Sequence, residues 1–379
     1  MRRLAFLSVL LCGCGLTSAA QQPRLTGVTP NAPNSEARAV IAEKAVADRL
    51  QAFFEQKAED GFSGEIWVSV RGRTLFREAY GHSGCSGDPI RVGGVYLIGS
   101  LVKDYTKLAI FKLADQQKLA LDDPIGEYLP GLASDLQNIT ISMLAEHRSG
   151  LPDTIDKSSA PTDYSLDWDY EPVDRHQLLQ RAAGARQVHE PDAERHYSNL
   201  GYSLLAAIIE VAAGTPYEHF LRQHIFTPLG MQQTGYVSPN LDAQQLIDGC
   251  RDGQLWPMPS VDRGWLEDGP SWNLRGNGGM VGTADDIGRW MGAFHGKDLL
   301  SNHFRDAWLS TVMGTSKTFQ SRAVGAGGSN GIYNAYYLLL TEPEVSLVML
   351  SNNEAFLVER YKDEVFAIIA DGLISTGSK

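Results

Sequence analysis

The sequence lacks the signatures of several common functional classes. Its nine histidines never occur as His-x-His or His-Glu-x-x-His, and no cysteine pair has zinc-ligand spacing, which argues against a zinc hydrolase. A Gly-x-Gly-x-x-Gly motif after an early strand and a Walker loop are also missing, so neither nucleotide-binding motif is present. The 379 residues carry a net charge of −12, which disfavours binding to nucleic acid or anionic lipid. We therefore expect no metal, no cofactor and no nucleic-acid partner.

No apolar run reaches the length of a membrane span. The N-terminus carries Arg2 and Arg3, then the apolar stretch 4–11, then small residues up to Ala20. This stretch is too short to cross a bilayer and is typical of an export signal. Residues 1–20 are therefore predicted to be a signal peptide, and the protein to be periplasmic or secreted.

Two processing routes fit this signal equally. Cleavage after Ser18-Ala19-Ala20 would release a soluble protein that starts at Gln21. Leu11-Cys12-Gly13-Cys14 instead resembles a lipoprotein box, in which Cys14 would carry a lipid anchor. The sequence leaves both routes open.

Cysteine is scarce. Two of the four cysteines lie in the signal region, which leaves Cys85 and Cys250. Export would permit a disulfide between them, but the sequence does not show whether they are adjacent in the fold.

Strand patterns lie near both ends of the mature chain, with helical patterns between them. Residues 21–36 are predicted to be a flexible leader, and 37–379 one catalytic domain with a helical subdomain at roughly 100–320. The expected strands are 65–70, 74–80, 332–340 and 345–350. The expected helices are 37–56, 100–117, 141–147, 200–213, 217–226, 284–294 and 355–371. This order predicts an α+β fold with one sheet closed by both termini. Two long irregular stretches, 153–190 and 238–276, are candidate walls of a site.

Two serines are candidate nucleophiles. Ser329 lies in Gly327-Gly328-Ser329-Asn330-Gly331, which matches the Gly-x-Ser-x-Gly elbow of α/β-hydrolases. That elbow needs a following helix and a histidine farther along the chain. Here the next segment is strand-like and the last histidine is His303, which lies upstream. Ser329 is therefore interpreted as a turn residue.

Ser100-Leu101-Val102-Lys103 is the better candidate and is the only Ser-x-x-Lys in the chain. The spacing of three residues places both side chains on one face of a helix. Ser100 would lie at the helix start, where free backbone N–H groups favour developing negative charge. A serine hydroxyl needs a neighbour that accepts its proton, and Lys103 can do so in its neutral form.

Tyr197-Ser198-Asn199 is a second candidate element, and Tyr197 is the only tyrosine followed two residues later by Asn. A tyrosine hydroxyl can relay protons, and the Asn199 amide can hold a substrate carbonyl or the lysine.

Ser100-x-x-Lys103 followed by Tyr197-x-Asn199 resembles the serine β-lactamase and DD-peptidase superfamily, in its class C-like branch. That branch contains class C β-lactamases, D-alanyl-D-alanine carboxypeptidases, D-aminopeptidases and related esterases. The resemblance runs from about Phe62 to the C-terminus. It includes IGSLVKDYTKLAIFKLADQQKLALDDPIGEYLP, ITISMLAEHRSGLPD, YSNLGYSLLAAIIEVAAGTPYEHFLRQHIFTPLGMQQTGY, NGGMVGTADDIGRWMGAF and LSNNE.

The resemblance implies a β-lactamase/transpeptidase-like fold, in which an antiparallel sheet packs against a helical subdomain with the active site between them. It implies that Ser100 is the acylated nucleophile, Lys103 its base, Tyr197 a proton shuttle and Asn199 a substrate-positioning group. His147, within HRSGLPD, is interpreted as a structural residue that ends a helix before a turn.

One departure from the family pattern concerns the third motif, Lys-Thr-Gly or His-x-Gly. It should fall at 324–328, where Gly327 and Gly328 fit but Ala326 replaces the cation. The resemblance implies that the backbone N–H groups of Ser100 and Ser329 form the oxyanion hole, which needs no particular side chain. A substitute cation could come from Arg275, Arg289 or Arg322.

The sequence thus predicts an exported serine hydrolase that forms an acyl-Ser100 intermediate on an ester or amide, either a small molecule or a peptide. Loss of the cation at Ala326 favours an esterase-like activity, because a substrate carboxylate would lose a charge-assisted hydrogen bond. The alternatives are a true class C-like β-lactamase, a D-alanyl-D-alanine carboxypeptidase, or a catalytically silent penicillin-recognising protein. The oligomeric state stays open.

Overall fold

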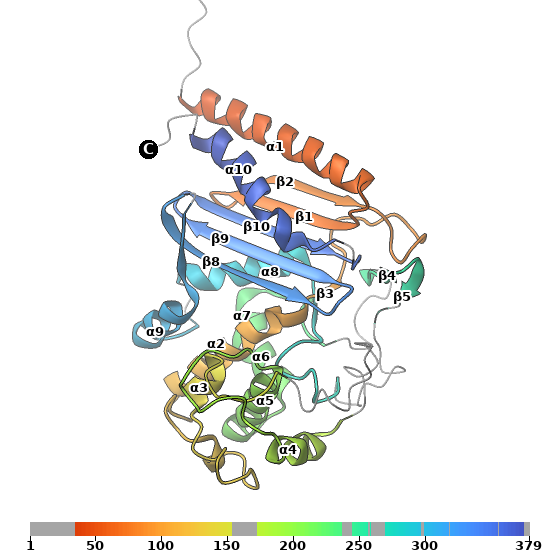
Figure 1. Ribbon diagram of the computed structural model, residues 1–379. Coiled ribbons are helices and arrows are strands. Elements are labelled where there is room, and N and C mark those ends of the chain that lie inside the picture. The colour runs from red at the N-terminus through yellow and green to blue at the C-terminus, as the bar shows by residue number, and fades with distance from the viewer. Residues whose placement is uncertain are drawn as a thin grey trace, which may run out of the picture.

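The computed structural model describes residues 35–153, 173–236, 245–256, 258, 270–296, 299–317, 319–354 and 356–374. The predicted signal peptide and nearly all of the predicted leader lie outside these residues. The fold is built around one antiparallel sheet with helices on both faces (Figure 1).

Six strands form the main sheet, in the order β2-β1-β10-β9-β8-β7. Their bounds are Gly64–Val70 for β1, Arg73–Tyr80 for β2, Gly314–Ser316 for β7, Ser321–Ser329 for β8, Asn334–Thr341 for β9 and Glu344–Ser351 for β10. Strand β1 pairs antiparallel with β10 along its whole length, from Gly64 opposite Ser351 to Val70 opposite Val345. The prediction of one sheet built from both ends of the chain is therefore confirmed.

The central strands are buried on both faces, because the two-residue period of a strand sends alternate side chains into two different cores. In β1, Ile66 and Val68 pack with α1 (Ser35–Glu59) and α10 (Lys362–Ile374), whereas Trp67 packs against the core of the helical subdomain. Figure 1 shows α1 and α10 over one face of the sheet, with the other helices on the opposite side.

The helical subdomain lies between β2 and β7 in the chain. Its α-helices are α2 (Val102–Asp115), α3 (Ile141–Ala145), α4 (Arg175–Ala183), α5 (Asn199–Ala213), α6 (Tyr217–Leu221), α7 (Thr227–Leu229), α8 (Ala284–Met291) and α9 (Asn302–Val312). A π-helical turn, Arg222–Phe226, joins α6 to α7, and 3-10 turns occur at Gly99–Leu101, Ile125–Glu127, Gly292–His295 and Val358–Tyr361.

Helix α5 is the centre of this subdomain, because its sequence is apolar almost all round and residues 200–209 are all buried. It begins after Ser198, whose hydroxyl accepts the Gly201 N–H, and it ends at Gly214 in the left-handed conformation, φ 69°. Both ends match the usual capping preferences.

Several boundaries differ from the predictions. The stretch 153–190 was expected to be irregular, but it contains helix α4. An Asp174/Gln177 capping box starts this helix. The short strands β4 (Gly249–Arg251) and β5 (Gln254–Trp256) lie in the second expected loop. The final helix starts at Lys362 instead of 355, after a 3-10 turn. Helix α9 and strand β8 were not among the predicted elements.

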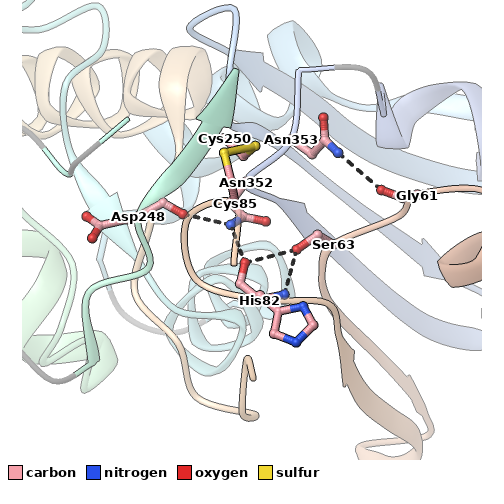
Figure 2. The surroundings of a disulfide bond; sticks show 8 residues. All are labelled: Gly61, Ser63, His82, Cys85, Asp248, Cys250, Asn352 and Asn353. Atoms are coloured by element: carbon pink, nitrogen blue, oxygen red, sulfur yellow. Dashed lines mark hydrogen bonds between the residues drawn. A yellow bond between two sulfur atoms is a disulfide. The ribbon is translucent and has the colours of Figure 1, made fainter. Parts of the chain in front are cut away.

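Cys85 and Cys250 form a disulfide, which answers the question that the sequence left open. The bond joins the segment after β2 to β4. Figure 2 shows that Asn352, the residue after β10, forms hydrogen bonds to both of these segments. The Asn352 side chain donates to the carbonyl oxygens of His82, at 2.9 Å, and Asp248, at 2.7 Å. The Cys250 N–H in turn donates to the Asn352 carbonyl at 3.0 Å.

No single helix among the described residues is long and apolar enough to cross a membrane, and only the bent pair Asn199–Ala213 and Tyr217–Leu229 meets the length and composition criteria together.

We predict that replacing both Cys85 and Cys250 with Ser lowers the free energy of unfolding by about 3–5 kcal/mol, because the bond closes a long loop in the unfolded chain. The sequence separation of 165 residues sets that loop. Urea unfolding of both proteins measures the difference. Reductant should weaken the wild type but not the double variant, and equal stability of the two proteins would contradict the prediction.

Candidate active site

Ser100 lies in the 3-10 turn that leads into α2, directly beside strand β8. Gly99 precedes it with φ 51°, and a Cβ on Gly99 would lie 2.6 Å from the Ser329 nitrogen. A Cβ on Gly328 would lie 2.1 Å from the Ile98 carbonyl oxygen and 2.8 Å from the Ser100 nitrogen. The backbones of the turn and the strand therefore touch, and glycine is needed on both sides of the contact.

The structure brings Lys103 and Tyr197 to the Ser100 hydroxyl. Lys103 Nζ donates to Ser100 Oγ at 3.1 Å, and the Tyr197 hydroxyl lies 2.8 Å from the same oxygen. Lys103 Nζ also lies 4.9 Å from the centre of the Tyr197 ring. The lysine is 6% exposed, whereas Tyr197 is 37% exposed. The three residues predicted to be catalytic thus form one hydrogen-bonded group.

Burial raises the pKa of Tyr197 to about 12, although its hydrogen bond with Ser100 works in the opposite direction. At neutral pH the phenol is therefore protonated. A protonated phenol can pass a proton on by donating its own while it accepts another. This charge state suits Tyr197 to the relay that was predicted for it.

Asn277 is a contributor that sequence reasoning missed. Its carbonyl oxygen accepts a hydrogen bond from Lys103 Nζ at 2.6 Å. Its side-chain amide donates to Ser203 Oγ of α5 at 2.8 Å, and the preceding Gly276 carbonyl lies 2.6 Å from Thr106 Oγ1 of α2. This carbonyl orients the lysine. Asn277 begins the NGGMVG stretch, so the stretch was noticed but the backbone contact could not be read from it.

The Asn199 amide is directed to a neighbouring loop. Asn199 Nδ2 donates to Asp153 Oδ1 at 2.9 Å, and the Asn199 backbone N–H reaches the same oxygen at 3.2 Å. This pair fixes the start of α5. The predicted role of Asn199 in binding substrate stays a prediction.

The oxyanion hole predicted at Ser100 and Ser329 stays a prediction, and the strand geometry shows where the Ser329 N–H points. The Asn330 N–H donates to the Tyr333 carbonyl across the β8–β9 turn. Because paired and unpaired positions alternate in an antiparallel ladder, the Ser329 N–H points away from β9. Strand β7 pairs with β8 only at 321–323, so the Ser329 N–H lies on an open strand edge beside Gly99.

Ala326 lies opposite Tyr337 in the sheet and packs against the core of the helical subdomain. None of the three arginines considered as a substitute cation supplies one there. Arg275 is 3% exposed and donates to the Pro270 carbonyl. Arg289 pairs with Asp286 at 2.7 Å, and Arg322 lies opposite Thr315, at the β7 end of the strand.

A cavity of about 440 Å³ opens on the other side of this strand end. Gly327 and Ser329 line it from β8, and Glu359 and Arg360 line it from the turn before α10. Glu359 accepts an ion pair from Lys362 at 3.0 Å, whereas Arg360 is exposed. Sequence reasoning missed this cation, because Val358–Tyr361 carries no motif that connects it to β8.

Comparison with known proteins places these observations in a family. The Beta-lactamase family model matches residues 46–370. The chain is 26% identical to penicillin-binding protein 4* of Bacillus subtilis (strain 168), over 80% of this chain and 71% of that protein. It is 28% identical to the D-alanyl-D-alanine-carboxypeptidase/endopeptidase AmpH of Escherichia coli (strain K12), over 86% of this chain and 81% of that protein.

An esterase and a β-lactamase structure are also similar. The chain is 29% identical to esterase EstB of Burkholderia gladioli, over 64% of this chain and 68% of the esterase. A crystal structure of a class C β-lactamase superposes with a TM-score of 0.68 at 17% identity, covering 88% of this chain and 98% of the other. This likeness confirms the predicted β-lactamase/transpeptidase-like fold.

We predict that Gly328→Ala lowers kcat by about 10²-fold, the usual loss when one oxyanion-hole donor is displaced. The new methyl group would clash with backbone at Ile98 and Ser100, which cannot move aside cheaply. Gly327→Ala is the matched comparison, because its methyl group meets the flexible end of Glu359 at 2.8 Å. Its loss should stay below about tenfold. Steady-state kinetics on both variants, with melting temperatures as a folding control, decide the point. Full activity of Gly328→Ala would refute an oxyanion hole at this contact.

Proposed function

Because the chain belongs to the beta-lactamase family of serine hydrolases, we propose that it hydrolyses esters or amides through an acyl-Ser100 intermediate. The observation that carries this proposal is the Ser100 hydroxyl, which lies within hydrogen-bond distance of both Lys103 and Tyr197. The Ser329 N–H lies beside the same turn. A nucleophile, two proton-transfer groups and an oxyanion donor are thus gathered at one place.

The reaction follows from this geometry. Ser100 Oγ attacks the substrate carbonyl while its proton passes to the neutral amine of Lys103. The carbonyl oxygen, which becomes negatively charged, accepts hydrogen bonds from the N–H groups of Ser100 and Ser329. When the bond to the leaving alcohol or amine breaks, Tyr197 donates a proton to that group and regains one from Lys103. Water then attacks the acyl carbonyl in the reverse sequence, releasing the acid and restoring the Ser100 hydroxyl.

Within this class, we propose a preference for neutral acyl esters over substrates that carry a carboxylate. At position 326 an incoming carboxylate would meet a methyl group. Tyr337 lies opposite this position in the sheet, and its hydroxyl donates to Asp104 at 2.7 Å, so that donor is already used. Both features disfavour an anionic substrate group on that side of β8. The name of the relative EstB supports an esterase assignment.

A carboxypeptidase or β-lactamase activity is the second candidate, and Arg360 is the observation that favours it. This cation lines the same cavity as Ser329, so it is placed to meet a carboxylate from the outer side of β8. The relative AmpH is named as a D-alanyl-D-alanine carboxypeptidase. A catalytically silent role is disfavoured, because Ser100, Lys103 and Tyr197 are all present and in contact.

We also propose that the protein is exported, on the strength of the arginines and the short apolar run at its N-terminus. The mass of the mature protein from its native host should correspond to a start at Gln21 or at a lipid-modified Cys14. An unprocessed Met1 would refute both routes.

The first kinetic prediction concerns the nucleophile. Ser100→Ala should abolish covalent labelling by a fluorophosphonate or a fluorescent penicillin, and Lys103→Ala should lower turnover by about 10²-fold or more. The double variant should be little worse than either single variant, because the two residues act as one unit. Ser310→Ala, at an exposed position on α9, is the matched control and should label normally. Normal turnover of Ser100→Ala would rule out the mechanism.

The second kinetic prediction concerns substrate class. The wild type should hydrolyse short-chain nitrophenyl esters with a higher kcat/KM than nitrocefin or penicillins. A lost charge-assisted hydrogen bond costs about 1.5–3 kcal/mol, or one to two powers of ten in kcat/KM. Ala326→His should raise activity on the carboxylate substrates and leave ester hydrolysis nearly unchanged.

The opposite order would refute the ester preference and point to Arg360. In that case Arg360→Ala should lower kcat/KM for penicillins by about 10-fold or more and affect nitrophenyl esters little, because only the anionic substrate loses a partner. Measuring both substrates on all three proteins therefore assigns the activity to one side of the strand.

A further inference from the structure

His147 has contacts that the interpretation of a simple helix end does not explain. It follows α3 with φ 58°, and it begins the segment 147–153 that runs beside residues 196–199. The His147 carbonyl accepts the His196 N–H at 2.7 Å, and His147 Nδ1 accepts the Ser198 N–H at 3.1 Å. One residue thus holds the backbone immediately before and immediately after Tyr197.

The imidazole ring also supports the Tyr197 side chain. The two rings stack with their centres 4.6 Å apart and an angle of 27° between their planes. The imidazole packs against Tyr202 as well, at 4.9 Å, and the Tyr202 hydroxyl is fixed by donating to the Ala145 carbonyl at 2.8 Å. Because Tyr197 is more than a third exposed, this stack helps to keep its ring in one orientation.

The hydrogen bond from the Ser198 N–H also defines the protonation state of the His147 imidazole. Nδ1 acts as an acceptor, so it carries no proton. Burial lowers the pKa of His147 to about 3, and the positive charges of Arg195, Lys103 and Lys107 and the His196 ring act in the same direction. The imidazole is therefore neutral throughout the range in which a free histidine titrates, and its support of Tyr197 does not change with pH there.

We propose that His147 is the positioning residue of Tyr197: its neutral ring and its two backbone hydrogen bonds hold the phenol at Ser100. This inference rests on the proposed function, in which Tyr197 relays protons. A misplacement of about 1 Å in a catalytic group can cost 10²-fold in rate, so a residue that fixes the phenol should affect kcat much more than KM.

His147→Asn is the test variant, because asparagine tolerates the left-handed backbone conformation and its amide oxygen can accept the Ser198 N–H, while the ring is lost. We expect kcat on a nitrophenyl ester to fall about 10- to 100-fold, with KM changed less than about twofold. In a Tyr197→Phe background the same change should cost less than about threefold, because the group being positioned is already gone.

His196→Asn is the matched control, since that ring contacts His189 at 5.9 Å and makes no stack with Tyr197. Its kcat should stay within about twofold of the wild type. If His147→Asn does not fold, the same cycle is run with His147→Phe, which keeps the ring and loses the acceptor. Unchanged kcat, or equal losses with and without the Tyr197 hydroxyl, would overturn the positioning role. Full activity of Tyr197→Phe alone would instead refute the proposed relay.

Discussion

The rest of the site depends on a backbone-to-backbone contact between the turn at Gly99–Leu101 and strand β8. Any side chain at Gly328 would meet the Ile98 carbonyl and the Ser100 nitrogen, and any at Gly99 would meet the Ser329 nitrogen. This contact brings the helical subdomain to the open edge of the sheet. It places two N–H groups from distant parts of the chain beside one serine, which neither part could do alone.

The Ser100 hydroxyl is then fixed from the subdomain side. Lys103 is one helical turn away and is buried, so its Nζ needs hydrogen-bond partners inside the protein. The Asn277 carbonyl provides one. Its loop is held by α2, where Thr106 donates to the Gly276 carbonyl, and by α5, where Ser203 accepts from the Asn277 side-chain amide. Tyr197 lies just before the start of α5, where Ser198 caps the helix. The segment 147–153 lies beside this helix start. The chemistry thus depends on the packing of α2 against α5.

The sequence predicted the helices and strands in which apolar side chains recur at a regular spacing. The apolar strands β1, β9 and β10 and the apolar helix α5 were found in this way. Strand β8 was not, because its sequence SRAVGAGGS offers glycines where an alternating pattern would need apolar side chains. Ser100, Lys103 and Tyr197 could be selected because their residue types are themselves chemical signals. The Asn277 carbonyl could not, since every residue has a carbonyl, and the contact exists only once the loop lies beside α2. The pairing of Cys85 with Cys250 likewise depended on distance in the fold and not on spacing in the chain.

Successive residues of β8 face opposite sides of the strand, and the proposed function uses the two sides differently. A Cβ on Gly328 would point at the turn that carries Ser100, while Gly328 itself lines the outer cavity together with Gly327, Ser329 and Arg360. Ala326 shares the inner face with Gly328, where it packs against the subdomain core. Under the proposed function, a residue at 326 or 360 would change which substrate charge is accepted, while the backbone contact at 328 and the Ser329 N–H would stay as they are. In that proposal, position 326 bears on substrate class more than on the reaction itself, because the groups around Ser100 do not include its side chain.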